Sequence, residues 1–72
     1  MALVKRSLSL NGHRTSVALE PEFWSVLDAA ARGSGQSTEH LVAQVDRDRG
    51  ETPLASSLRV YALTAQRNSL PE

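Results

Sequence analysis

The dipeptide Asn11-Gly12 lies between two short segments in which large apolar residues alternate with small or polar ones. Such alternation is typical of β-strands with one buried face. Asn-Gly favours a two-residue type I′ turn, because both central residues of that turn need a positive φ angle. We therefore expect a β-hairpin over residues 4–19, with Leu10 opposite His13 across the turn.

This register determines which side chains share a face of the hairpin, because alternate residues of a strand point to the same side. One face is predicted to be polar, small and basic, with Lys5, Ser7, Ser9, Arg14, Ser16 and Ala18. The opposite face is predicted to be apolar, with Val4, Leu8, Leu10, Val17 and Leu19. Arg6 is the exception on the apolar face, and we expect it to bend toward water because it lies near the end of the hairpin.

Start and stop signals divide the rest of the chain, and they predict helices over residues 21–33, 37–49 and 53–67. Pro21 suits the first position of a helix, and Ser37 suits an N-cap. Pro53 follows Thr52, which predicts the start of the third helix. A hairpin followed by helices is an α+β fold, and we expect it to occupy residues 1–72 as one domain.

The chain has 72 residues and no cysteine, so neither disulfides nor thiolate zinc sites can reinforce its small core. A second subunit is the remaining reinforcement. Apolar residues of the third helix also form a stripe broader than one small core needs. We therefore expect an intertwined homodimer, with a dimer core made of Val17, Leu19, Leu41, Val45, Leu58 and Tyr61.

The formal net charge is zero, which argues against a strongly electrostatic nucleic-acid binder. The charged residues are unevenly distributed along the chain, because Lys5, Arg6 and Arg14 lie in an N-terminal segment that contains no acid. A neutral chain can still present one basic face to phosphate, although an ordinary solvated N-terminus is the alternative interpretation. No apolar run is long enough for a membrane span and no signal peptide is recognised, so we expect a cytoplasmic protein.

The sequence offers little for catalysis or cofactor binding. No serine lies in a Gly-x-Ser-x-Gly motif, and the histidines His13 and His40 lack partners at catalytic or metal-ligand spacing. The glycines at positions 33 and 35 are too close together for a phosphate-binding loop and predict a turn between helices. We therefore expect a protein that is not an enzyme and that holds no cofactor or metal.

The order of elements is the most specific feature of the sequence. A strand over residues 13–19 leads through Glu20-Pro21 into an amphipathic helix, and a Gly-x-Ser turn leads into a second helix. Over roughly residues 13 to 49, this order resembles the ribbon-helix-helix superfamily of dimeric bacterial repressors. Residues 5–24 and 54–60 also look like a bacterial subfamily of ribbon-helix-helix domain proteins, over nearly the whole chain.

In that superfamily, one strand of each subunit pairs with its twin, and the resulting ribbon enters the major groove of DNA. The residues that the resemblance implies to contact bases are Arg14, Ser16 and Ala18. It also implies that backbone N–H groups at the start of the second helix, around Ser37 and Thr38, hold a phosphate, as helix N-termini do. Lys5 and Arg6 are expected to contact the flanking DNA backbone.

The third helix and the extra hairpin strand both depart from the usual family pattern. Neighbouring strands lie about 4.8 Å apart, so a four-stranded dimer sheet spans roughly 14 Å against a major groove about 12 Å wide. Three arrangements remain open at this point. In the first, the central pair of strands reads bases while the outer strands flank it. In the second, residues 1–10 form a loose arm, and in the third, the sheet does not bind DNA.

These features predict a dimeric DNA-binding regulator of transcription, a repressor, that inserts a β-ribbon into the major groove of duplex DNA. The alternative is a dimeric protein-interaction module, adaptor-like or antitoxin-like, whose third helix and exposed Trp24 or Tyr61 engage a partner protein. Zero net charge favours the interaction module. The basic N-terminal face favours DNA, which is the prediction we prefer.

Overall fold

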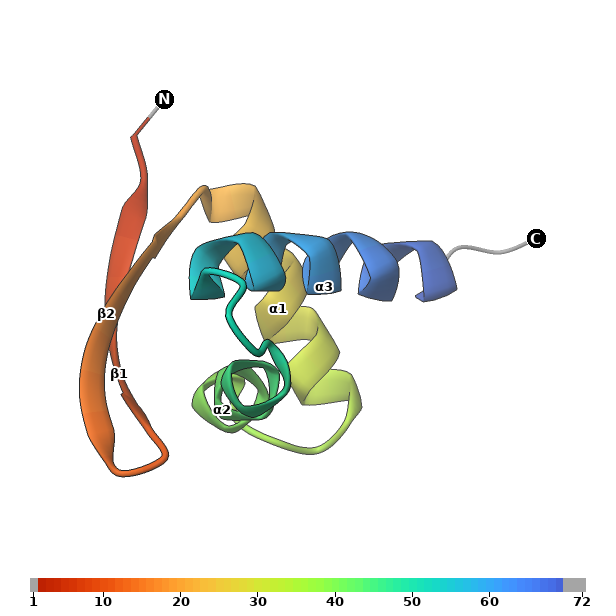
Figure 1. Cartoon of the computed structure of the whole chain (residues 1–72). Helices are drawn as coiled ribbons and strands as arrows, with labels where there is room; N and C mark the ends of the chain where they lie inside the picture. The colour runs from red at the N-terminus through yellow and green to blue at the C-terminus, as the bar shows by residue number, and fades with distance from the viewer. Residues whose placement is uncertain (1, 70–72) are drawn as a thin grey trace.

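The computed structural model describes residues 2–69. Two strands come first, β1 (Val4–Leu10) and β2 (His13–Leu19), followed by three helices, α1 (Pro21–Gly33), α2 (Thr38–Asp48) and α3 (Leu54–Ser69) (Figure 1). A hairpin followed by three helices confirms the predicted α+β fold. The ranges expected for the second and third helices, 37–49 and 53–67, differ from the observed ends by one or two residues.

The hairpin has the register that its turn predicts. The two strands pair antiparallel, with Leu10 opposite His13 next to the turn and with all seven residues of each strand paired. The φ angles of Asn11 and Gly12 are 52° and 86°, as a type I′ turn requires. The possibility that residues 1–10 form a loose arm is therefore wrong, because residues 4–10 are a full partner of β2.

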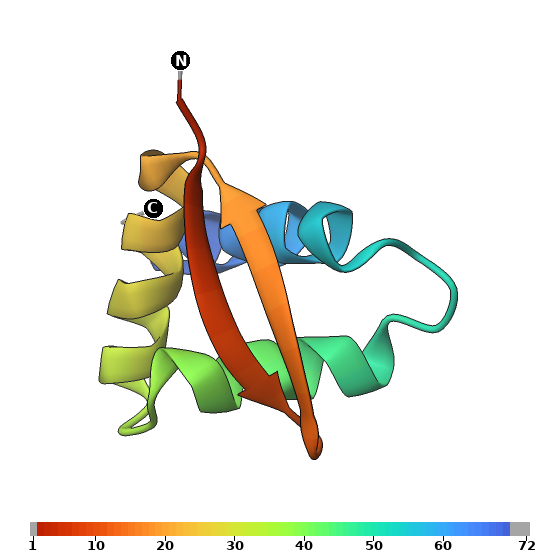
Figure 2. The same ribbon diagram turned by 90° about the vertical axis from the view of Figure 1, so that its left-hand side faces the viewer.

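The hairpin lies across one side of the helical layer, and Figure 2 shows both strands passing in front of the helices. β1 packs against α2, and β2 packs against α3. The turn is also tied to α2, because the side-chain oxygen of Asn11 accepts a hydrogen bond from Arg47 at 3.0 Å. These contacts hold one face of the hairpin against the helices and leave the other face outside.

One core joins the hairpin and the three helices. Its buried members are Leu8, Leu10, Val17, Leu19, Trp24, Leu27, Ala31, Leu41, Val42, Leu58 and Ala62. Trp24 is only 2% exposed, and its indole N–H donates a hydrogen bond to the carbonyl of Val4 at 2.7 Å. The expectation of an exposed Trp24 that engages a partner protein is therefore wrong.

The residues expected to form a dimer core are found mainly in the core of one chain. Leu19 and Leu58 are 0% exposed and Leu41 is 1% exposed without any second subunit, and Val17 is also buried. Val45 and Tyr61 are half-buried. The apolar stripe of α3 is thus largely covered by the chain's own α1, α2 and β2, and exposed apolar residues on α3 are Val60 and Leu63.

Burial of α3 gives a stability test with an internal control. Leu58→Asp should lower the free energy of unfolding by at least about 3 kcal/mol, because the new carboxylate has no partner in the core. Ser56→Asp lies on the same helix but at an exposed polar position, so it should change stability by less than about 0.5 kcal/mol. Urea denaturation of both variants checks this. Equal stability of the two variants would contradict the packing of α3.

Candidate nucleic-acid interface

The outward face of the hairpin carries the side chains that the sequence places there. The cross-strand pairs on this face are Lys5 with Ala18, Ser7 with Ser16, and Ser9 with Arg14. All of them are exposed except Ala18, which is half-buried. They point away from the helices because residues at the alternate positions, Leu8, Leu10, Val17 and Leu19, are buried against the core.

Three residues predicted to contact bases, Arg14, Ser16 and Ala18, therefore lie in a row on β2, with Lys5 across the ribbon from Ala18. The guanidinium of Arg14 donates a long hydrogen bond of 3.5 Å to the hydroxyl of Ser9 on β1. The six side chains of this face include two cations and no carboxylate. The face thus combines hydrogen-bonding groups, one methyl group and positive charge.

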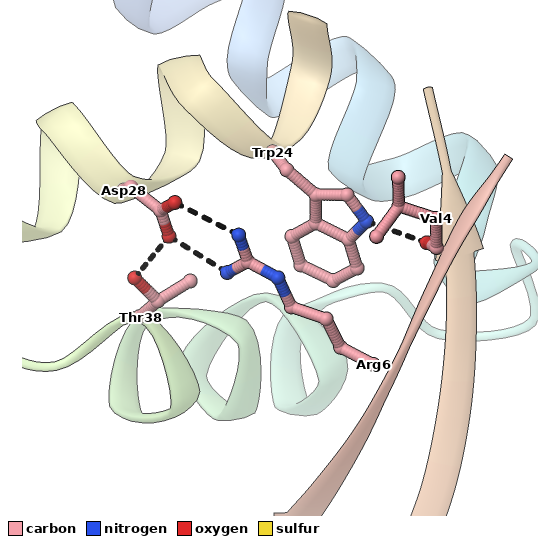
Figure 3. A network of polar contacts seen from close by, with 5 residues as sticks. All are labelled: Val4, Arg6, Trp24, Asp28 and Thr38. Carbon is pink, nitrogen blue, oxygen red and sulfur yellow. Dashed lines mark hydrogen bonds and ion pairs between the residues drawn. The ribbon is translucent and has the colours of Figure 1, made fainter. Parts of the chain in front are cut away.

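Arg6 does not lie on this outward face. Its guanidinium donates two hydrogen bonds to the carboxylate of Asp28, at 2.8 and 2.9 Å, and lies 4.4 Å from the centroid of the Trp24 ring (Figure 3). The hydroxyl of Thr38 donates a third hydrogen bond to Asp28 at 2.7 Å. The structure gives Arg6 an intramolecular partner, and the expectation that it bends toward water is wrong.

The electrostatics of this cluster follow from its hydrogen bonds. The hydrogen bonds from Arg6, together with the hydrogen bond from Thr38, hold the pKa of the Asp28 carboxyl below its ordinary value, although partial burial acts to raise it. The hydrogen bond with Asp28 in turn raises the pKa of Arg6. Because Arg6 belongs to β1, Asp28 to α1 and Thr38 to α2, the cluster joins three elements.

The start of α2 is the other predicted phosphate contact. Ser37 is the N-cap, as predicted, and its hydroxyl accepts a hydrogen bond from the backbone N–H of His40 at 3.0 Å. Two carboxylates lie close to this helix end: Asp28 contacts Thr38, and Glu39 belongs to the first turn. Both stabilise the positive end of the helix dipole and oppose the approach of a phosphate.

The sequence interpretation missed the residues that attach β1 to the helices. Besides the Arg6 cluster, the Glu39 carboxylate accepts a hydrogen bond from the backbone N–H of Ser9 at 2.9 Å. One signal was available for the cluster: Trp24 and Asp28 are four residues apart on α1, so they share a face, and an arginine on an apolar strand face needs such a partner. No comparable signal exists for Glu39.

Within residues 2–69, no three histidine, cysteine or acidic side chains are grouped so that they could hold a metal ion. None of the helices described by the structure is long and apolar enough to cross a membrane. The recognisable feature is thus the polar hairpin face itself.

A strand that leads directly into a pair of helices, here β2 followed by α1 and α2, is the element order of the ribbon-helix-helix class of small domains. A sequence profile of the ribbon-helix-helix domain family matches residues 3–66, and the chain belongs to that family. The family is one of DNA-binding regulators.

A solved structure is similar in both sequence and fold, that of an uncharacterized protein from Bordetella pertussis Tohama I. The two share 37% identity with a TM-score of 0.81, and the match covers 92% of this chain. The chain spans 57% of the length of that protein. No curated protein matches the sequence.

The lowered pKa of Asp28 gives a pH test. The carboxylate stabilises the fold above the ordinary carboxyl pKa of about 4, and this contribution is lost as the pH falls through the lower pKa of the folded state. Asp28→Asn should cost about 1 kcal/mol at pH 7, since the pair is partly exposed, and should flatten the fall in stability below pH 5 or so.

Thermal denaturation from pH 7 to about pH 2 measures this effect. Asp48→Asn is the control, because it removes an exposed acid of α2. An Asp28→Asn protein whose stability falls with acid as steeply as the wild type would show that the cluster does not stabilise the fold.

Proposed function

We propose that the chain is a sequence-specific DNA-binding regulator of transcription, acting as a repressor, and that the outward face of its hairpin enters the major groove. The observation that carries the proposal is this face: a two-stranded ribbon with Arg14, Ser16 and Lys5 exposed and with no carboxylate among its six side chains. Membership of a family of DNA-binding regulators supports it.

Each side chain of β2 on this face has a suitable base partner. The Arg14 guanidinium can donate two hydrogen bonds to guanine, the Ser16 hydroxyl can bond to several base edges, and the Ala18 methyl can contact the methyl group of thymine. Lys5 is long and flexible, and it supplies a cation for a phosphate at the rim of the groove. We assign no phosphate to Arg6, because Asp28 already holds its guanidinium.

The proposal gives the phosphate contact at Ser37 and Thr38 a smaller role than the sequence prediction does. The backbone at the start of α2 can approach DNA only with the carboxylates of Asp28 and Glu39 alongside. We therefore place the main phosphate contact at Lys5.

The homodimer is also part of the proposal, but the argument for it differs from the one made from the sequence. A partner chain is not needed to cover Leu41 or Leu58, which one chain already buries. Val60 and Leu63 are 65% and 60% exposed on α3, and Val60 lines a groove of about 530 Å³ together with Tyr61. This apolar surface is where we place the second chain.

Sedimentation at micromolar concentration should show a dimer for the wild type, and Val60→Asp should shift it toward a folded monomer, because a carboxylate in an apolar interface is desolvated. Ser56→Asp places the same charge at an exposed polar position of α3 and should leave the dimer intact. A monomeric wild type would remove the dimer from the proposal.

A protein-interaction module is the second candidate. The same groove between α2 and α3, with Val60 and Tyr61 on its wall, favours it, as does the zero net charge. A mobility-shift assay on genomic fragments at two salt concentrations separates the candidates. Retention of particular fragments over random DNA supports the regulator, whereas no retained fragment at either salt concentration supports the interaction module.

Arg14 is the residue on which DNA reading most depends. Arg14→Ala should weaken binding to the preferred fragment by about 1–3 kcal/mol per site while changing binding to random DNA much less. Folding should be nearly unchanged, because the side chain is exposed. Fluorescence anisotropy with both DNAs measures the difference.

Lys5→Ala is the matched comparison on the opposite strand. It should weaken binding to both DNAs alike and reduce the salt dependence of the binding constant by roughly one phosphate contact. If Arg14→Ala instead binds the preferred fragment as tightly as the wild type, the hairpin does not read the sequence of the DNA.

A further inference from the structure

The side chain of Arg14, on which base reading is proposed to depend, is exposed. An arginine side chain has several rotatable bonds, so fixing its guanidinium on DNA costs conformational entropy unless the free protein already holds it. Among the residues that the structure describes, this guanidinium forms no ion pair, and its hydrogen bond goes to the hydroxyl of Ser9 at 3.5 Å. This bond is long, so its effect depends on how firmly Ser9 is placed.

Ser9 is held in place by the strand on which it lies and by a neighbouring helix. Its backbone N–H donates a hydrogen bond to the carboxylate of Glu39 on α2 at 2.9 Å. Its neighbours in β1, Leu8 and Leu10, are 7% and 3% exposed, and burial of both turns the side chain of Ser9 to the outward face. The Ser9 hydroxyl is therefore a fixed acceptor on that face.

The register of the hairpin brings this acceptor next to the guanidinium. Ser9 lies directly opposite Arg14, and residues so placed in an antiparallel pair have Cβ atoms about 5 Å apart. Because a guanidinium has several N–H donors, a hydrogen bond to Ser9 leaves enough of them for a bidentate contact with guanine. Ser9 lies on the β1 side of Arg14, so the contact does not depend on what pairs with the other edge of β2.

We propose that Ser9 is a positioning residue for Arg14. Its hydroxyl holds the guanidinium over the outward face of the hairpin in the free protein, and Arg14 keeps this contact while it donates to a base. This inference rests on the proposed DNA binding. Because the guanidinium is held in advance, less conformational entropy is lost on binding. Ser9 acts through Arg14 and needs no base contact of its own, and Glu39 contributes by fixing the backbone of Ser9.

Ser9→Ala removes the hydroxyl from the full chain and should weaken binding to the preferred fragment about fivefold, with little change on random DNA, as the entropy of one long side chain predicts. Ser9→Thr keeps a hydroxyl on a residue that suits a strand, and it should bind within about twofold of the wild type. Fluorescence anisotropy with both DNAs measures these changes. Thermal denaturation should show wild-type stability for both variants, because position 9 is exposed.

A double-mutant cycle separates positioning from an independent contact. In the Arg14→Ala background, Ser9→Ala should have no further effect on the preferred fragment, because no guanidinium remains to be held. Ser7→Ala is the matched control, since Ser7 is exposed on the same face of β1 but lies opposite Ser16. Its effect on binding should be the same with and without Arg14.

The base preference of the variants gives a further measurement. Selection of DNA sequences should show that Ser9→Ala relaxes the preference at the same base position as Arg14→Ala does. A serine that contacted a base itself would relax a different position, and that result would contradict the inference.

The outcomes separate the inference from the function on which it rests. If Arg14→Ala loses its preference while Ser9→Ala binds as the wild type does, or weakens binding equally in both backgrounds, the inference is wrong although DNA reading stands. If Arg14→Ala keeps the wild-type preference, or the wild type prefers no DNA, the proposed function fails first and the inference fails with it.

Discussion

The contact between Arg6 and the Trp24–Asp28 face of α1 is the interaction on which the arrangement of the hairpin depends. A charged side chain on the helix-facing side of a strand is stabilised by a carboxylate partner and by an aromatic ring that its cationic group can lie over. Asp28 supplies the first and the Trp24 ring the second. Since Asp28 also accepts the Thr38 hydroxyl, the same group orients the start of α2 (Figure 3).

The exposed face of the hairpin is a consequence of what is buried on the other side. Leu8 and Leu10 of β1 and Val17 and Leu19 of β2 are all less than 8% exposed. Because successive strand residues alternate between faces, burial of these four forces their neighbours outward. A slip of one residue would bury the polar set, so packing of the core keeps the candidate binding face in register.

The hairpin was predictable from sequence and much of its environment was not. The Asn11-Gly12 turn is a local signal, and it determines every cross-strand pair. The partners of Arg6 and the backbone of Ser9 lie 22 and 30 residues away, so they depend on helix placement that the sequence pattern does not specify. The expected dimer core stays a prediction, because an apolar stripe shows that a surface is covered but not whether the same chain or another covers it.

Zero net charge shapes how a protein with this face can recognise DNA. Non-specific affinity grows with the number of phosphates that cations neutralise, and the outward face offers only Lys5 and Arg14, with carboxylates at the start of α2. Under the proposed function, phosphate contacts from this face are therefore few, and base contacts supply a larger share of the binding free energy. In that proposal, a face with few cations and several hydroxyl groups is suited to discriminate between sequences more than to bind DNA non-specifically.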